Sequence, residues 1–358
     1  MEEKFAFESG EVSIAFGIMC GALGDTLISK KVFDSLLELA PNCKADIFLT
    51  NDKRDCFKDY IKAFYGKIKN INFVYDDINV YDEISKKYDL AIRVWHMILI
   101  DGTNEEKLKS EVPKLFQAVQ KIKLYNRSGF DRMKTIEGTV LSNITRAHIL
   151  GINRYTCLSC GGALPINDNR VEIPLLPEGE RAFHELGLSK NYITIGSNMK
   201  NARFHRHIIK EWPTSYFVDY VSLLNQKLPQ KQIVQIGGGG VEKLPNVDKY
   251  ILDADLELVK YVLKNSLLHV DCESGLVHLA TQLGTKCLVL FGATDEKYFA
   301  FKENLNLVSD FCHPCVHAWN NGSTCLRGAK EPLCMLSITP QQVFEVTRKY
   351  LNRLRLKK

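Results

Sequence analysis

The sequence predicts an α/β protein made of two successive doubly wound units. Three observations lead to this prediction. The strand-like apolar run 12–16 leads through a glycine-rich turn into helical apolar spacing over 26–39. The same alternation restarts after Pro174 and Pro177. A chain of 358 residues is also longer than a single domain usually is, so two domains are expected.

The first half alternates short apolar runs with helical segments. Strands are expected at 12–16, 45–50 and 89–94, with a helix at 26–39. Strands that alternate with helices usually form a parallel sheet with helices on both faces. The first half is therefore expected to be a parallel α/β unit.

The second half repeats this pattern. The strands expected there are 192–196, 232–236, 267–270 and 287–291. The main helices are 214–228 and 341–354, the latter started by Thr339-Pro340. Two Rossmann-like halves predict a ligand at the carboxyl ends of the strands, in a cleft between two domains.

These boundaries define the expected domain organisation. We expect a first domain over 1–178 and a second over 179–338 with a cysteine-rich tail. A C-terminal helix over 339–358 is expected to pack back towards the first domain.

Composition and charge narrow the functional classes. The chain is 45% hydrophobic and 25% charged, which is ordinary for a globular protein, and its net charge of +5 does not favour a nucleic-acid partner. The absence of a long apolar run and of an apolar N-terminal signal predicts a cytoplasmic protein. The basic segment 348–358 suits a solvated helix end; the alternative is a peripheral contact with an anionic membrane, which would be the inner one.

The turn at Glu273, Ser274 and Gly275 is the most informative local feature. It lies between a predicted strand and a short helix. Backbone N–H groups and the positive end of the helix dipole meet at such a turn, which favours phosphate. A carboxylate beside it can accept hydrogen bonds from sugar hydroxyls. The turn therefore predicts a nucleotide-like ligand.

The glycine-rich turn after the first strand contains Gly24 and Asp25. Its glycines are not spaced as GxGxxG, which disfavours a plain dinucleotide site. Asp25 has two interpretations of similar weight: an N-cap of the following helix, or a general base at the ligand site.

Two other charged segments each allow a functional and a structural interpretation. The segment 197–213 contains several cations that could neutralise a diphosphate, but a charge run is more often a solvated loop. Asp253 and Asp255 resemble a metal-binding DxD, but a helix cap is the stronger interpretation.

The sequence has 11 cysteines, and their odd number argues against a disulfide scaffold. Four of them, Cys312, Cys315, Cys325 and Cys334, could form a tetrahedral site for structural zinc or iron. The equally weighted alternative is a set of reduced, partly buried thiols. A second CxxC pair, 157–160, has no partner pair near it in the sequence.

Five motifs line up in a fixed order along the chain. They are Gly24-Asp25-Thr26-Leu27, Lys210-Glu211-Trp212-Pro213, the segment 273–280, the segment 291–295, and a tail made of 312–315, 334–335 and 338–343. In these motifs the chain resembles the ADP-heptose heptosyltransferases of glycosyltransferase family nine. The resemblance implies the GT-B fold, in which two Rossmann-like domains face a central cleft.

The resemblance also implies an inverting sugar transfer from a nucleotide diphosphate sugar. Asp25 matches the general base, with Gly24 beside it in the donor-binding set. Lys210 matches the residue that binds the donor diphosphate, and Ser197 or Asn198 would assist. The first domain would bind the acceptor, and the second the donor. A divalent metal would not be obligatory for catalysis.

The second part of the implied donor site is the turn near residue 273. Ser274 and Gly275 would hold phosphate, and His278 lies one helical turn further on. Where the family usually has aspartate, this chain has Glu273, which leaves the donor nucleotide open.

The identity of the acceptor also stays open: it is a lipopolysaccharide core sugar, another surface glycan or a protein side chain. The oligomeric state stays open as well. The alternatives to an enzyme of this class are a non-catalytic nucleotide-sugar-binding protein on the same fold and, less favoured, a Rossmann-type oxidoreductase or epimerase.

Overall fold

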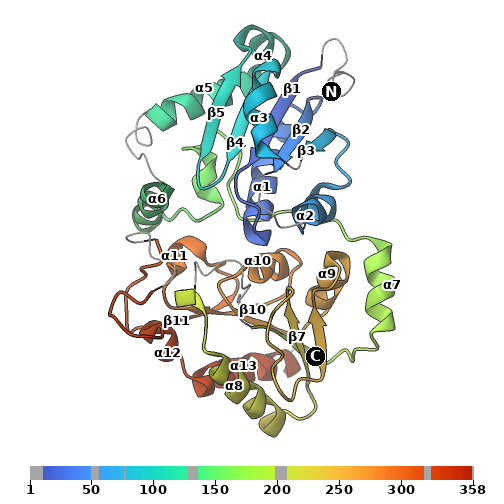
Figure 1. Ribbon diagram of the computed structural model, residues 1–358, viewed down its shortest axis with the longest axis vertical. Helices are drawn as coiled ribbons and strands as arrows, with labels where there is room; N and C mark the ends of the chain where they lie inside the picture. Colours follow the sequence, from blue (N-terminus) through green and yellow to red (C-terminus); the bar gives the residue numbers. More distant parts are fainter. Residues whose placement is uncertain are drawn as a thin grey trace. The chain divides into compact units, whose positions relative to one another are not determined.

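The computed structural model describes residues 11–49, 56–75, 77–127, 136–197, 208–317 and 324–356. The chain divides into two compact units, Met1–Pro174 and Leu175–Lys358, coloured blue to green and green to red in Figure 1. The division falls inside the proline-containing segment after which the sequence restarts its strand–helix alternation.

The first unit contains a five-stranded sheet in the order β3-β2-β1-β4-β5. The strands are β1 (Ser13–Ile18), β2 (Lys44–Leu49), β3 (Ile71–Tyr75), β4 (Leu90–Val94) and β5 (Ile98–Thr103). β1, β2, β3 and β4 pair in parallel, as the sequence predicted. The edge strand β5 is antiparallel to β4. Only three residues join these two strands, too few for the crossover that a parallel pair needs.

The helices of the first unit are α1 (Leu23–Leu39), α2 (Cys56–Tyr65), α3 (Ile78–Ile84), α4 (Glu105–Glu111), α5 (Pro113–Tyr125) and α6 (Ile136–Leu150), with the 3-10 turns η2 (Ser85–Lys87) and η4 (Thr156–Ser159). Helices α1 to α5 lie around the five-stranded sheet, and α6 lies further from it (Figure 1). Leu27 and Phe33 of α1 are fully buried, and the Phe33 ring packs edge-on against Phe16 at 5.1 Å. Each such side chain contributes about 1.5–3 kcal/mol by burial, so α1 is fixed on β1.

The second unit contains a six-stranded sheet in the order β11-β10-β9-β6-β7-β8. Its strands are β6 (Tyr192–Gly196), β7 (Gln232–Gly237), β8 (Lys249–Leu252), β9 (His269–Cys272), β10 (Cys287–Phe291) and β11 (Leu305–Val308). Every pair in this sheet is parallel. The strand order reverses between β6 and β9, and in such sheets ligands bind at the carboxyl ends beside the reversal.

The second unit also has helices on its sheet. They are α7 (Pro177–Glu185), α8 (Thr214–Lys227), α9 (Leu256–Lys264), α10 (Gly275–Gln282), α11 (Glu296–Phe299), α12 (Leu333–Leu336) and α13 (Pro340–Arg355), with the 3-10 turn η5 (Ile208–Lys210). In the described part of the chain, none of the helices is long and apolar enough to cross a membrane.

The C-terminal helix α13 is the element that the sequence predicts to pack back towards the first domain. Its residues Val343, Phe344 and Leu351 lie in the core of the second unit. Thr347 of α13 also shares a 2.8 Å hydrogen bond with Tyr220 of α8. The apolar stripe of α13 is therefore buried against α8, and the helix belongs to the second unit.

Candidate functional site

Asp25 lies where β1 passes into α1, at the carboxyl edge of the first sheet. The helix begins with Ala22 as its N-cap, earlier than the predicted start at residue 26. The interpretation of Asp25 as the N-cap is therefore wrong, because Asp25 occupies the first turn instead. A carboxylate in this turn interacts favourably with the helix dipole. The side chain of Asp25 is 24% exposed, and Gly24 beside it is buried.

Both oxygens of the Asp25 carboxylate have donors within the first unit. The Arg154 guanidinium donates through Nη2 to Oδ1 at 3.1 Å, and the Cys20 thiol donates to Oδ2 at 3.1 Å. The same Arg154 nitrogen donates to the carbonyl of Trp95, which directly follows β4. Sequence reasoning missed Arg154 and Cys20. Arg154 lies 129 positions from Asp25 and carries no local signal.

The turn 273–275 forms the start of α10, as predicted. Ser274 is the N-cap and accepts a hydrogen bond from the Val277 N–H at 3.4 Å. The backbone N–H groups of Gly275 and Leu276 begin the helix and so have no acceptor within it. The Ser274 hydroxyl donates its proton to Asp271 Oδ2 at 2.6 Å. Ser274 thus shapes the turn, and the groups positioned to donate to an anion are backbone N–H groups.

Asp271 holds this turn through its hydrogen bond with Ser274. The sequence predicts no role for it. It is buried at the end of β9, and its Oδ1 accepts the Cys272 N–H at 2.7 Å. Gly196 ends the neighbouring strand β6, and a Cβ there would meet Asp271 Oδ2 at 2.3 Å. A side chain at position 196 would force the Asp271 carboxylate to move, so the close approach of β6 helps to fix Asp271 under the α10 turn.

Lys210 and Glu273 form an ion pair beside this turn. Lys210 Nζ lies 2.9 Å from Glu273 Oε2, and the two side chains are 15% and 10% exposed. His278 Nε2 is 3.7 Å from the other oxygen of Glu273. Burial alone would raise the pKa of the Glu273 carboxyl, but Lys210 and His278 outweigh burial and hold it well below its ordinary value. The structure thus brings together three residues that the sequence analysis singled out.

Trp212 holds the Lys210 segment in place. Its side chain is fully buried, and its indole N–H donates to the Ile338 carbonyl at 2.7 Å. Its backbone N–H donates to Cys272 Sγ at 3.2 Å, next to Glu273 in the chain. The tryptophan in the Lys-x-Trp-Pro motif therefore acts as a core anchor that fixes the position of Lys210.

Ser197 directly follows β6 and is buried. Its hydroxyl accepts a 2.6 Å hydrogen bond from the Gln235 amide of β7. That leaves its own proton for another acceptor. Asn198, the other predicted assisting residue, lies outside the described residues, as do the cations at 200, 203 and 206.

Asp255 is the N-cap of α9, where it accepts from the Glu257 N–H at 2.7 Å. The helix-cap interpretation of the DxD sequence is confirmed.

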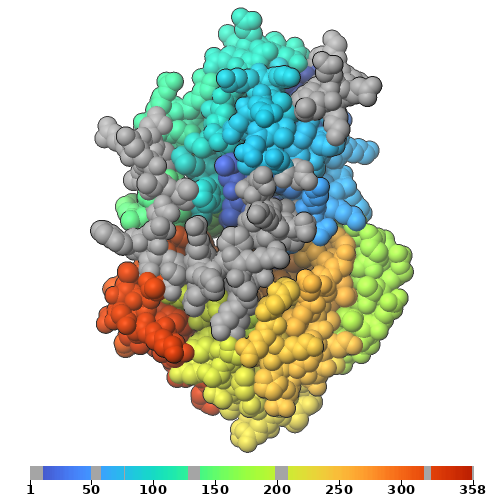
Figure 2. Space-filling view, viewed as in Figure 1, coloured from blue at the N-terminus to red at the C-terminus, as the bar shows by residue number. Residues whose placement is uncertain are grey.

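The C-terminal cysteines lie in the second unit, where Cys334 is buried in the core and Cys312 and Cys315 pack against that core. Burial, followed by the charges of Cys312, Cys315 and Cys325, raises the pKa of Cys334 to about 11. At Cys325, three backbone N–H groups outweigh burial and lower the pKa. This segment reaches the surface in the orange-red region of Figure 2. Within the described residues, however, no three His, Cys, Asp or Glu side chains converge as ligands of a metal ion.

The other CxxC pair, Cys157 and Cys160, is buried around η4 in the first unit. Burial and the neighbouring Cys157 raise the pKa of Cys160 to about 12. The described cysteines are all free thiols.

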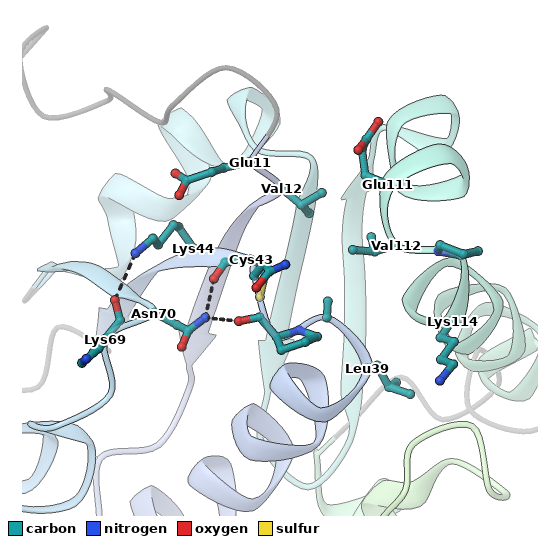
Figure 3. Close-up of a pocket in the computed structure, with 14 residues that line it drawn as sticks. Glu11, Val12, Leu39, Cys43, Lys44, Lys69, Asn70, Glu111, Val112 and Lys114 are labelled. Atoms are coloured by element: carbon teal, nitrogen blue, oxygen red, sulfur yellow. Dashed lines mark hydrogen bonds between the residues drawn. The ribbon is translucent and has the colours of Figure 1, made fainter.

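A groove of about 670 Å³ lies at the amino ends of β1 and β2, away from Asp25 (Figure 3). Two of its polar side chains bond within the protein: Lys44 donates to the Lys69 carbonyl, and Asn70 donates to the carbonyls of Pro41 and Cys43. Nothing in this groove points to the predicted chemistry.

Structural comparison finds solved glycosyltransferase structures that are similar to this chain over 95–96% of its length. ADP-heptose LPS heptosyltransferase II of E. coli matches with a TM-score of 0.58 and 13% identity, over 95% of this chain and 99% of that one. A family 9 glycosyl transferase from Veillonella parvula matches with a TM-score of 0.56 and 14% identity, over 96% and 100%. The dodecameric iron-containing heptosyltransferase TibC of enterotoxigenic E. coli, in complex with ADP-D-β-D-heptose, gives 0.57 and 14%, over 96% and 78%.

These likenesses confirm the GT-B fold that the sequence motifs implied. At such low identities they show the fold alone. No family model matches the sequence, and neither does any curated protein.

Proposed function

We propose that the protein is an inverting glycosyltransferase that uses a nucleotide diphosphate sugar. The observation that carries this proposal is the cation held at a helix start: Lys210 lies beside the first turn of α10, at the carboxyl end of the second sheet. A fixed cation together with backbone N–H donors suits a diphosphate.

The second unit would hold the donor. The diphosphate would accept from Lys210 and from the first N–H groups of α10, while Ser197 and Asn198 assist. Glu273, which is itself paired with His278, would keep Lys210 in place. As the bond from the sugar to the diphosphate breaks, charge grows on the leaving phosphate, where preorganised donors are most effective. In this mechanism a divalent metal is not obligatory.

Asp25 of the first unit would act as the general base. It would take the proton from the acceptor hydroxyl, whose oxygen forms the new bond to the anomeric carbon. The bond from that carbon to the diphosphate oxygen breaks with its electron pair, and the carbon is inverted. The partial exposure of Asp25 suits this role, because a base must reach the proton that it accepts.

ADP-heptose is the donor that we propose, and a surface glycan such as the lipopolysaccharide core, or a protein, is the acceptor. The names of the similar structures support this choice: two of them are heptosyltransferases, and TibC was solved with ADP-heptose. The dodecamer of TibC also makes an oligomer a reasonable proposal. We propose a cytoplasmic location, in which the basic C-terminal segment makes a peripheral contact with the inner membrane.

A donor panel tests this function. ADP-, GDP-, UDP- and CDP-sugars are compared in thermal unfolding, because a ligand that binds the native state raises its melting temperature. ADP-heptose is expected to give the largest shift, and ADP release from it should follow. A shift without ADP release, with any acceptor offered, would favour the non-catalytic binding protein. Tight binding of NAD with no response to the sugars would favour the oxidoreductase.

We further propose that Cys312, Cys315, Cys325 and Cys334 hold a structural zinc or iron ion. Cys312, Cys315 and Cys325 each raise the pKa of Cys334, so all three lie in its surroundings, and thiolates are ligands for both metals. The iron in TibC supports this choice. Elemental analysis of the purified protein should find about one equivalent of metal, and less in Cys315→Ser. Protein without zinc or iron would contradict this part of the proposal.

A further inference from the structure

The first unit contains a cation that neither the motifs nor the comparisons assign to the reaction. Arg154 contacts Asp25 from a loop far away in the sequence. We propose that Arg154 is the positioning residue of the base: it fixes the Asp25 carboxylate in the orientation that receives the acceptor proton. This inference rests on the proposed function of Asp25.

Arg154 is itself held rigidly. Its side chain is 3% exposed, and its Nη2 bridges the Trp95 carbonyl and Asp25 Oδ1, both at 3.1 Å. Trp95 follows β4, while Asp25 follows β1, the adjacent strand. The guanidinium therefore ties together the carboxyl ends of two neighbouring strands.

The backbone of the Arg154 loop is also fixed. Asn153 Oδ1 accepts hydrogen bonds from the N–H groups of Tyr155 at 2.9 Å and Thr156 at 3.0 Å. The Thr156 hydroxyl accepts in return from the Asn153 N–H at 2.9 Å. These reciprocal bonds join the residues on both sides of Arg154, so the arginine side chain projects from a preorganised loop.

The two partners differ in what they present to solvent. Asp25 is 24% exposed, eight times the exposed fraction of the Arg154 side chain at 3%. Arg154 and the Cys20 thiol hold one oxygen each. A carboxylate held in this way keeps lone pairs for a further donor while losing its freedom to rotate. Reactions that depend on such orientation lose about 10²-fold in rate when a group moves by about 1 Å.

A double-mutant cycle on ADP release from ADP-heptose tests the assignment. We expect Arg154→Met to lower kcat by about 10–100-fold, with little change in the KM for ADP-heptose, because the donor site lies in the second unit. In an Asp25→Asn background, Arg154→Met should lower kcat by less than about threefold, because the effects of substitutions at coupled residues are not additive. Arg154→Lys keeps the charge but not the geometry, and should recover part of the loss.

Arg93→Met is the matched control. Arg93 also forms an arginine–aspartate pair in the first unit, with Asp101 at 2.7 Å. Its effect on kcat should be the same factor with and without Asp25.

Equal effects of Arg154→Met in the two backgrounds would overturn the inference. If Arg154→Met does not fold, Arg154→Lys carries the same cycle, and a kcat within about twofold of the wild type would overturn it equally. The proposed function has its own test: if the wild-type protein does not release ADP from ADP-heptose, the proposed function is wrong, and the inference about Arg154 is wrong with it.

Discussion

Each unit places a carboxylate and a cation together at the carboxyl end of its sheet, but the two pairs are built differently. In the first unit the cation, Arg154, is 3% exposed and the acid, Asp25, is 24% exposed. In the second unit Lys210 and Glu273 are 15% and 10% exposed, so the lysine is the more open partner.

This difference indicates which partner of each pair is available to a ligand. A buried arginine that presents a carboxylate suits proton transfer from a neutral hydroxyl. A buried glutamate that presents a lysine beside a helix start suits an anion. Similar ion pairs can thus serve opposite purposes, and the exposure of each partner distinguishes them better than the distance between the charges.

Asp25→Asn should have the largest effect and tests the first pair. The amide cannot accept the proton, so kcat should fall by about 10²–10⁴-fold. Steady-state kinetics should show this loss of kcat, and titration with ADP should show an unchanged nucleotide affinity. Asp168→Asn is the control, because it removes an exposed carboxylate that pairs with Lys31 in the same unit. Undiminished turnover in Asp25→Asn would remove Asp25 from the role of base.

Lys210→Met tests the second pair and should act on binding. Loss of a charged hydrogen bond costs about 1.5–3 kcal/mol, so ADP affinity should fall by about 10–100-fold in calorimetric titration. Lys190→Met removes an exposed lysine from the same unit. It should leave the affinity within about twofold. If both variants bind ADP equally well, Lys210 does not contact the diphosphate.

The two pairs also differ in how far the sequence predicts them. Lys210, Glu273 and His278 lie in short motifs whose strand and helix contexts can be read locally, and α10 begins where it was expected to begin. Arg154 could not be predicted, because its contact with Asp25 depends on how a distant loop returns to the sheet.

Two further differences have the same physical origin. The edge strand β5 is antiparallel to β4 and joined to it by a short turn. The alternation of strands and helices in the sequence predicts only parallel pairs. Asp271 resembles any polar residue at a strand end. Its role under the α10 turn follows from its hydrogen bond with Ser274 and from the close approach of Gly196, which only the folded sheet shows.

Glu273→Gln tests whether the second pair stabilises the fold. The pKa of Glu273 is lowered in the folded protein, so its ionised form adds stability above the unfolded pKa, which is about 4.3. We expect the variant to lose about 1–3 kcal/mol at neutral pH. The difference from wild type should shrink as the pH falls below about 4.3 towards the folded pKa. Urea unfolding at several pH values measures it, and a difference that does not depend on pH would contradict the ion pair.

Ser274→Ala should have the smallest effect and separates the shape of the α10 turn from its charge. Loss of an N-cap costs about 0.5–2 kcal/mol of stability. Thr339→Ala is a matched control, because Thr339 caps α13 in the same unit through a similar side-chain bond. Both variants should lower the midpoint of urea unfolding by similar amounts.

Only Ser274→Ala should also weaken ADP binding, by about tenfold or less, because it loosens the N–H groups that face the phosphate. Equal ADP affinity in the two variants would show that Lys210 alone holds the anion, and the second pair would then be sufficient without the helix start.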